Sequence, residues 1–325
     1  MIKVLLLVFG FLFLQACTLC KDSSVDGTIQ CLNNMPVRDI DSHPAVQNYL
    51  QKHSVIISFT TSPERLKNLT PMLRTLDTTH VSHIWLALPK QYKNKEDYGV
   101  IPEEISKFPK LEIIARDQYD YGPITKMLPA IEKIKALDPD ALVISVDDDT
   151  GFPKGMINEL IYYSILHSNS IVSGAGNYVE IFGILPEEWP GLGKAQKRPF
   201  CGNAELSYCD TVEGWKAIAY KPRLVDTERM KQIAGISKAC RTSDDLVISY
   251  VLAESGVEKI RITNNYFPDI HRFESGHDEG ALHNIRLDIP GWSPRPSIDG
   301  KFSSTTNSER YQRCVLDIKN QKPNP

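Results

Sequence analysis

The stretch from Ala141 to Pro153, ALVISVDDDTGFP, constrains the fold of this 325-residue chain most strongly. Its first half, Leu142 to Val146, is apolar and rich in β-branched residues, which is typical of a buried strand. Three aspartates follow at once, before Gly151 and Pro153 interrupt the pattern and begin a helix. In open α/β sheets, ligands bind outside the carboxyl ends of the strands. The stretch therefore predicts a ligand site where a buried strand ends.

The three aspartates suit a divalent cation. Alternate side chains of an extended chain point the same way, so Asp147 and Asp149 are predicted to share a side while Asp148 points elsewhere. Two converging carboxylates can hold a hard cation through their oxygens. The alternative is a strand that ends in a solvated acidic turn.

An apolar strand, Asp-x-Asp and a loop into a helix resemble the DXD motif of glycosyltransferases with the GT-A fold. The resemblance covers roughly residues 54–290 and rests on several short strings in order. It implies a single α/β domain over residues 51–290, with a Rossmann-like mixed central sheet flanked by helices. It also implies a metal-dependent enzyme that transfers a sugar from a nucleotide-sugar donor to a hydroxyl of a glycan, lipid or protein acceptor. Asp147 and Asp149 would then bind Mn²⁺ or Mg²⁺, and Asp147 and Asp148 would lie against the donor.

The remaining apolar runs alternate between strand-like and helix-like patterns. Strands are predicted at residues 54–59, 83–89, 111–116, 170–173, 216–220 and 259–263. Helices are predicted at residues 64–76, from about 125 to 134, and at 153–167 and 246–254.

The string TTSPER, residues 60–65, follows the first predicted strand. Ser62 or Thr61 is expected to cap the next helix, with Pro63 in its first turn. The string resembles the first nucleotide-binding turn of GT-A enzymes, which implies that Thr60 and Arg65 lie near the base, the ribose or the phosphates. The alternative for Arg65 is a solvated helix position.

The string YGPITK, residues 121–126, opens another predicted helix with a lysine. The helix macrodipole disfavours a cation there, so Lys126 is expected to face something anionic. The string resembles YGPxTK in a group of GT-A-like proteins, which implies that Lys126 approaches a phosphate. Asp120 is expected to contact the sugar or to orient Lys126. The alternative is a surface loop.

Two later segments are candidates for the acceptor side of the site. Glu213 and Trp215 flank a glycine, and an aromatic ring beside an acid suits a sugar; the alternative is that Trp215 belongs to the core. Asp244 and Asp245 open the helix at residues 246–254 and resemble the acidic helix start that places the catalytic base in inverting GT-A enzymes. The alternative for this pair is a helix cap, since acids are favourable at a helix N-terminus.

Three histidines, His271, His277 and His283, recur at intervals of six. Many GT-A enzymes add a late histidine to the metal shell, and imidazole is compatible with manganese. The resemblance makes His283 or His277 the candidate ligand. The alternative for each is a surface or hydrogen-bonded histidine.

The N-terminus is predicted to lie outside the fold. Residues 1–17 contain an apolar run, Val4 to Leu14, of signal-peptide length that is too short to span a bilayer comfortably. The string LQAC resembles a bacterial lipobox with Cys17 as the lipidated residue; the alternative is a type II anchor in a Golgi-type secretory lumen. The chain is therefore expected to be exported or attached to a membrane by this segment. Residues 18–50 are interpreted as a stalk and residues 291–325 as a tail.

Cysteine and charge content narrow the compartment and the partners. Without Cys17, six cysteines remain, an even number that suits disulfides in an oxidising compartment. Cys20 could pair with Cys31 and Cys201 with Cys209, which would leave Cys240 for Cys314; the alternative is a set of reduced cysteines. The net charge is −3 with no long basic stretch, so nucleic acid is not expected as a partner.

Two other functions are compatible with parts of the pattern. A haloacid dehalogenase-type phosphohydrolase also uses Asp-x-Asp after a strand, but needs Thr or Val where this chain has Gly151 and places the motif near the domain's N-terminus. A lipoprotein that binds sugars or nucleotides without turnover is the other alternative, because bacterial periplasm is not thought to hold nucleotide sugars.

Overall fold

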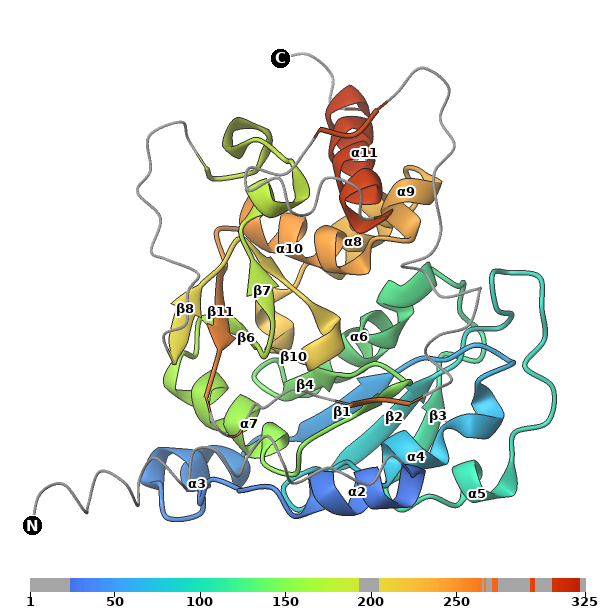
Figure 1. Ribbon diagram of the computed structural model, residues 1–325, viewed down its shortest axis with the longest axis vertical. Coiled ribbons are helices and arrows are strands. Elements are labelled where there is room, and N and C mark those ends of the chain that lie inside the picture. Colours follow the sequence, from blue (N-terminus) through green and yellow to red (C-terminus); the bar gives the residue numbers. More distant parts are fainter. Residues whose placement is uncertain are drawn as a thin grey trace, which may run out of the picture.

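The apolar runs pair into one eight-stranded sheet, in the order β3-β2-β1-β4-β10-β6-β11-β8 (Figure 1). The computed structural model describes residues 24–192, 205–264, 266, 271–273, 293–295 and 306–321. The strands of this sheet are β1 Val55–Phe59, β2 His83–Ala87, β3 Leu111–Ile114, β4 Leu142–Ser145, β6 Ser170–Ser173, β8 Leu206–Tyr208, β10 Ile218–Tyr220 and β11 Glu258–Ile262. Two small sheets pair β5 Thr150–Gly151 with β12 His271–Arg272, and β7 Gly176–Asn177 with β9 Thr211–Val212.

The loops that follow the parallel strands lie at the same edge of the sheet. Strands β3, β2, β1 and β4 run parallel, and β10 lies antiparallel between β4 and β6. Because β10 is antiparallel to both β4 and β6, β6 runs in the same direction as β4. Strand β11 is parallel to β6 and therefore runs in that direction too. The carboxyl ends of β1 and β4 therefore meet at the edge from which β10 starts.

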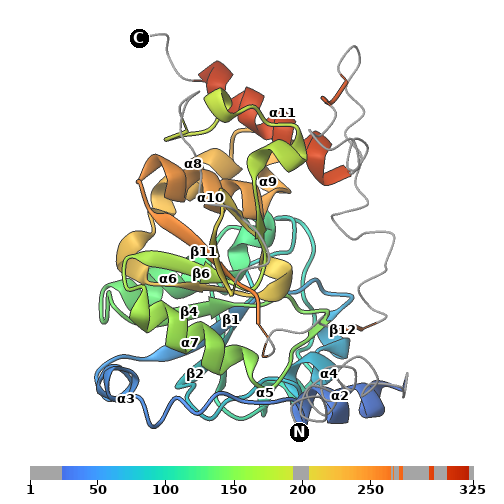
Figure 2. The ribbon, with the colours of Figure 1, turned by 60° about the vertical axis from the view of Figure 1, so that its left-hand side comes forward.

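Helices cover both faces of the sheet (Figure 2). Strand residues alternate between the faces, so Ile56 packs in one apolar cluster while Val55 and Ile57 pack in the other. On the Ile56 face lie α6 Leu128–Lys135, α8 Thr227–Ala234, α9 Lys238–Arg241, α10 Asp244–Glu254 and α11 Thr306–Gln321. On the other face lie α2 Val25–Asn33, α3 Pro44–Leu50, α4 Thr70–Leu73, α5 Glu103–Ser106 and α7 Met156–Leu166. The predicted class, α/β with a mixed central sheet flanked by helices, is confirmed.

The helix predicted at residues 64–76 is wrong in its extent. Only the single turn Leu66–Asn68 and the four-residue α4 are helical in this segment. Pro71 lies at the start of α4, and a proline has no N–H with which to continue a helix from the preceding turn. The expected cap is also wrong, because Arg65 is the N-cap of the turn and no side chain caps it; the Ser62 hydroxyl accepts a hydrogen bond from the N–H of Arg65 at 3.3 Å, ahead of the helical residues.

Residues 24–50, interpreted as part of a stalk, instead pack on the domain. Ile29 and Leu32 of α2 are buried, and Leu32 lies against Gly151 just after the aspartates. Arg38 pairs with the fully buried Glu159 of α7, which needs a cation because a carboxylate is costly to bury alone. The segment therefore supports the loop that follows the aspartates.

Part of the predicted tail is also folded. Residues 306–321 form α11, whose Tyr311, Cys314 and Ile318 are buried. Cys314 forms a disulfide with Cys240, as predicted. Cys31 and Cys209 are disulfide-bonded too, while their predicted partners, Cys20 and Cys201, lie outside the described residues.

None of the described helices is long and apolar enough to cross a membrane. The predicted signal or anchor, residues 1–17, lies outside the described residues and stays a prediction.

Burial of one lysine in the sheet predicts an unusual pH dependence of stability. Lys259 of β11 is 6% exposed, and burial lowers its pKa to about 8 although Asp210 opposes the shift. Above pH 8 the unfolded chain holds this proton more tightly than the folded chain, so the free energy of unfolding should rise with pH up to about 10.5. We expect Lys259→Met to stabilise the protein by about 2 to 3 kcal/mol at pH 7, with the gain shrinking by pH 9.5. Chemical denaturation between pH 6 and 9.5 measures this.

The exposed Lys52 offers the matched control, since Lys52→Met removes a charge that is already hydrated. An equal effect of the two substitutions, or a gain at Lys259 that grows with pH, would contradict the assignment.

Candidate active site

The three aspartates follow β4 at the carboxyl edge of the sheet and pair with a cation from the end of β1. Arg65 donates from Nη1 to Asp148 at 2.7 Å and from Nη2 to Asp149 at 2.8 Å. The hydroxyl of Thr61 donates to the second oxygen of Asp148 at 2.6 Å. Burial raises the pKa of Asp148 to about 6, against the opposing effect of Arg65. Arg65 is therefore part of the acidic site and not a solvated helix residue.

The predicted alternation of the aspartates is wrong. Asp148 and Asp149 share Arg65, whereas Asp147 turns to Lys126. Regular strand geometry ends at Ser145, and a turn begins at Asp148. A period of two holds only while the backbone stays extended, so it does not apply across this turn.

Lys126 links the aspartate turn to the start of α10. It ends a short 3₁₀ helix, Gly122–Lys126, and its side chain is 6% exposed. Its Nζ lies 2.8 Å from Asp147 Oδ1 and 2.8 Å from Asp244 Oδ2. The expectation that Lys126 faces something anionic is confirmed, and the anions are carboxylates of the protein itself.

The charge of Lys126 is held by its acidic surroundings. Burial on its own would lower the pKa of the ammonium, but the neighbouring carboxylates outweigh burial and raise the pKa well above its usual value. The strongest of these attractions come from Asp147 and Asp244. Lys126 is therefore a permanent cation inside a cluster of acids.

Asp245 lies beside this cluster and remains half-buried. Its Oδ1 accepts a hydrogen bond from the backbone N–H of Gly214 at 2.8 Å. A side chain at position 214 would come too close to Lys126 Nζ, so any residue other than glycine would displace the ammonium group from its present position. Burial and the adjacent charge of Asp244 raise the pKa of Asp245 well above its usual range. The helix cap is Ser243, so neither aspartate is the cap residue.

The two residues that flank Gly214 are held together. Trp215 donates from Nε1 to Glu213 Oε2 at 2.9 Å, and Asn177 donates to the other oxygen of Glu213. Lys216 lies 4.8 Å from the centre of the Trp215 ring. Trp215 is half-buried, so it is not an ordinary core residue. The two predicted acceptor residues are thus the chain neighbours of Gly214, whose N–H binds Asp245.

Two predicted substrate contacts are engaged within the protein. The Thr60 hydroxyl donates to the carbonyl of Ala87 at 2.7 Å. Asp120 is 4% exposed, and its carboxylate accepts hydrogen bonds from the N–H groups of Lys93 and Gly122 at 2.6 and 2.7 Å. Asp120 therefore organises the turn before Lys126 and does not face a sugar.

The donor set for a metal is incomplete among the described residues, where no group of three or more His, Cys, Asp or Glu side chains could hold an ion. Asp147 and Asp149 supply carboxylate oxygens of the kind that Mg²⁺ and Mn²⁺ prefer. His277 and His283 lie outside the described residues. The β12–β5 pairing places His271 opposite Gly151, two residues after Asp149. The described residues therefore supply carboxylates suited to a cation but no complete set of ligands, and Asp147 and Asp149 turn to different cations of the protein.

Tyr311 was missed by the sequence analysis because residues 291–325 were interpreted as a tail. Its hydroxyl lies 3.5 Å from Asp245 Oδ2, and the residue is 4% exposed. Tyr311, Cys314 and Ile318 recur at helical spacing, which is the signal that could have predicted the buried face of α11.

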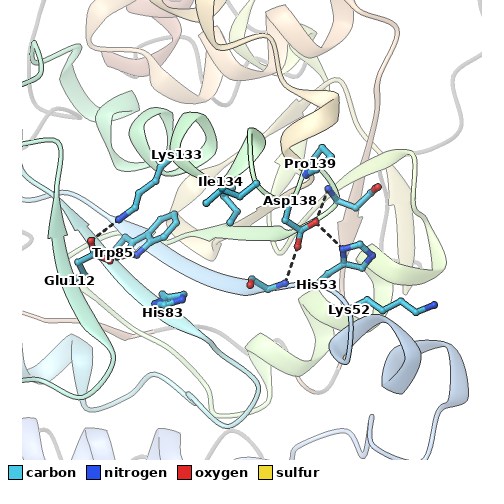
Figure 3. A pocket seen from close by; sticks show the side chains of 12 residues that line it. Lys52, His53, His83, Trp85, Glu112, Lys133, Ile134, Asp138 and Pro139 are labelled. Carbon is cyan, nitrogen blue, oxygen red and sulfur yellow. Dashed lines mark hydrogen bonds and ion pairs between the residues drawn. The ribbon is translucent and has the colours of Figure 1, made fainter.

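A cavity of about 680 Å³ lies at the opposite edge of the sheet, where β1 and β2 begin (Figure 3). Its charged groups pair with one another: His53 lies 2.8 Å from Asp138, and Lys133 lies 2.6 Å from Glu112. Ligands of open α/β sheets bind at the other edge, so the acidic cluster and not this cavity is the candidate active site.

No protein-family model matches this chain, and no curated protein matches its sequence. Solved structures with a similar fold include GalNAc-T7 crystallised with UDP, GalNAc and Mn²⁺, at 11% identity and a TM-score of 0.42 over 81% of this chain. The chain covers 47% of that protein, so it spans about half its length. Another is 4-diphosphocytidyl-2C-methyl-D-erythritol synthase, at 10% identity and a TM-score of 0.35, with 66% of this chain and 92% of that chain covered. At these TM-scores neither structure assigns a ligand or a residue role to this chain.

Replacement of Lys126 tests the ion bridge. Lys126→Met leaves two partly buried carboxylates without their cation, and we expect a loss of about 2 to 4 kcal/mol in the free energy of unfolding at pH 7. Without the lysine the carboxylates take up protons more readily in the folded state, so the loss should shrink toward pH 5. Chemical denaturation at both pH values measures it.

Lys133→Met is the control, because Lys133 is 40% exposed and pairs with Glu112 on the surface. A loss at Lys126 that matches the control, or that grows as the pH falls, would show that the bridge does not hold the cluster.

Proposed function

We propose that this chain is a metal-dependent glycosyltransferase that moves a sugar from a nucleotide-sugar donor to a hydroxyl of a glycan, lipid or protein acceptor. The observation that carries the proposal is the continuous charged network at the carboxyl edge of the sheet. It runs from Arg65 through the aspartate turn to Lys126, and from there to Asp244 and Asp245 of α10. In such a network, the residues that would bind a diphosphate are connected to the residue that would act as the catalytic base.

The donor side is formed by the aspartate turn, Arg65 and Lys126. Asp149, with Asp147 nearby, would hold Mn²⁺ or Mg²⁺, which supplies charge neutralisation for a diphosphate leaving group. Arg65 forms an ion pair with Asp149 in this structure, and its planar guanidinium could bind a phosphate equally well. With a cation bound at Asp149, Arg65 would pair with the phosphate oxygens instead. Lys126 keeps its charge and adds to the neutralisation.

The acceptor side is formed by Asp245, Glu213 and Trp215. Asp245 is half-buried, and burial together with Asp244 raises its pKa well above its usual range, the direction in which a carboxylate becomes a stronger base. In an inverting reaction the acceptor oxygen bonds to the anomeric carbon while its proton passes to Asp245. The bond from that carbon to the phosphate oxygen breaks, and the nucleoside diphosphate leaves with its electron pair. Trp215 and Glu213 border this point and would position the acceptor.

Calorimetric titration with UDP, GDP, ADP and CDP tests the donor site. We expect one nucleotide to bind in the presence of Mn²⁺ and not in its absence. Asp149→Asn should weaken this binding by about 100-fold or more, because it removes a charged ligand from the cation.

Asp140→Asn is the matched control, since Asp140 pairs with Arg223 away from the cluster. Absence of binding to every nucleotide, with disulfides intact, would sink the nucleotide-sugar proposal. That result would favour a lipid-linked donor or a sugar-binding lipoprotein without turnover.

The base is tested separately from the donor site. We expect Asp245→Asn to lower kcat for sugar transfer by about 10²- to 10⁴-fold while donor affinity by calorimetry stays within twofold. Retained transfer in Asp245→Asn would remove this residue from the chemistry and leave the donor site untouched.

A further inference from the structure

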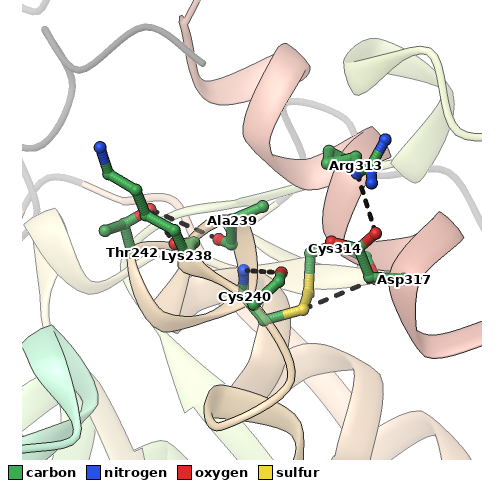
Figure 4. The surroundings of a disulfide bond; sticks show 8 residues. Lys238, Ala239, Cys240, Thr242, Arg313, Cys314 and Asp317 are labelled. Carbon is green, nitrogen blue, oxygen red and sulfur yellow. Dashed lines mark hydrogen bonds and ion pairs between the residues drawn. A yellow bond between two sulfur atoms is a disulfide. The ribbon is translucent and has the colours of Figure 1, made fainter. Parts of the chain in front are cut away.

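The C-terminal helix α11 lies over the start of α10, next to α9 (Figures 1 and 2). The Cys240–Cys314 disulfide joins it to α9, a few residues ahead of Asp244 and Asp245 (Figure 4). Gln312 adds a second attachment, because its side chain donates to the carbonyl of Phe182 at 2.8 Å. The helix is thus fixed at a defined position relative to the candidate base.

From this position α11 presents the Tyr311 hydroxyl to Asp245. The Tyr311 ring packs against Phe182 with 4.8 Å between ring centroids, which fixes the position of the ring. The hydroxyl lies 3.5 Å from Asp245 Oδ2, while Gly214 N–H binds the other oxygen at 2.8 Å. Hydrogen bonds of catalytic groups are often long in the absence of substrate and shorten when it binds.

The charges around Asp245 decide how much the Tyr311 hydroxyl can affect its ionisation. The groups that face it are Asp244 on its own helix, Lys126, Asp147, Glu213, and Arg310 with Tyr311 on α11. Three of them are carboxylates, which favour the protonated form of Asp245, while Lys126 opposes them. Burial and the nearby carboxylates raise the pKa of Tyr311, so its hydroxyl stays protonated and can only donate to an ionised Asp245.

We propose that Tyr311 is a positioning residue that keeps Asp245 ionised and oriented, so that the disulfide-bound C-terminal helix forms part of the active site. The role in catalysis rests on the proposed function, because it requires Asp245 to be the base. The interaction between the two side chains does not depend on that function.

The catalytic role is tested by the pH profile of transfer. Tyr311→Phe keeps the ring against Phe182 and removes only the donor. We expect the acidic limb of the kcat profile to move upward by about 0.5 pH unit, with kcat up to about 3-fold lower at pH 6 and close to wild type at pH 8. Donor affinity should stay within twofold. An unchanged profile would overturn the proposal, and so would a loss that is equal at all pH values.

Tyr250→Phe is the control for removal of a buried hydroxyl. Tyr250 lies on α10, is 2% exposed and packs against Trp189, away from the acidic cluster. Its substitution should leave the pH profile in place.

A double-mutant cycle tests the interaction without any turnover. Tyr311→Phe and Asp245→Ala are compared singly and together by chemical denaturation at pH 8. We expect the change in unfolding equilibrium constant caused by Tyr311→Phe to be about 3- to 10-fold smaller when Asp245 is already absent. Additive effects would overturn the proposal. Coupling in a protein that transfers no sugar would retain the interaction and reject the proposed function.

Discussion

The buried ion bridge of Lys126 with Asp147 and Asp244 holds the candidate site together. These three residues come from a 3₁₀ turn, the end of β4 and the start of α10. A cation at 6% exposure is stable there because carboxylates surround it, and those carboxylates are stable because the cation is present. Loss of Lys126 would leave Asp147 and Asp244 without their cation, and loss of both acids would leave the buried ammonium group without a counter-ion. The bridge therefore fixes the distance between the aspartate turn and the helix that carries Asp245.

The ion pairs of the site are also of a kind that a bound cation and a diphosphate could replace. Arg65 binds both Asp148 and Asp149, so one guanidinium partly offsets the charge of two carboxylates. A cation and a diphosphate that entered together would replace these pairs by new ones of the same type, carboxylate with metal and guanidinium with phosphate. The cation would also offset the carboxylate charge that Arg65 alone leaves over. For this reason the ion pairs of the cluster are compatible with the proposed nucleotide-sugar site.

Both described ends of the chain pack beside this cluster. Leu32 of α2 lies against Gly151 under the loop that follows the aspartates, and Tyr311 of α11 reaches Asp245 from the opposite face of the sheet. The Cys240–Cys314 disulfide and the Arg38–Glu159 ion pair fasten these segments. Segments that resembled a stalk and a tail in sequence thus take part in shaping the site.

The sequence by itself determined the fold class and every strand of the main sheet except β8, and it placed the acidic residues at the edge of that sheet. Apolar runs such as Leu142–Ser145 have one low-energy placement, inside a sheet, and the acids after them must lie at its edge. Only the tertiary structure decided the pairings: Asp148 with Arg65, Lys126 with Asp244, and Tyr311 with Asp245. Each joins residues far apart in the chain, and charge and hydrogen-bond partners are chosen by proximity in space, which no local pattern specifies.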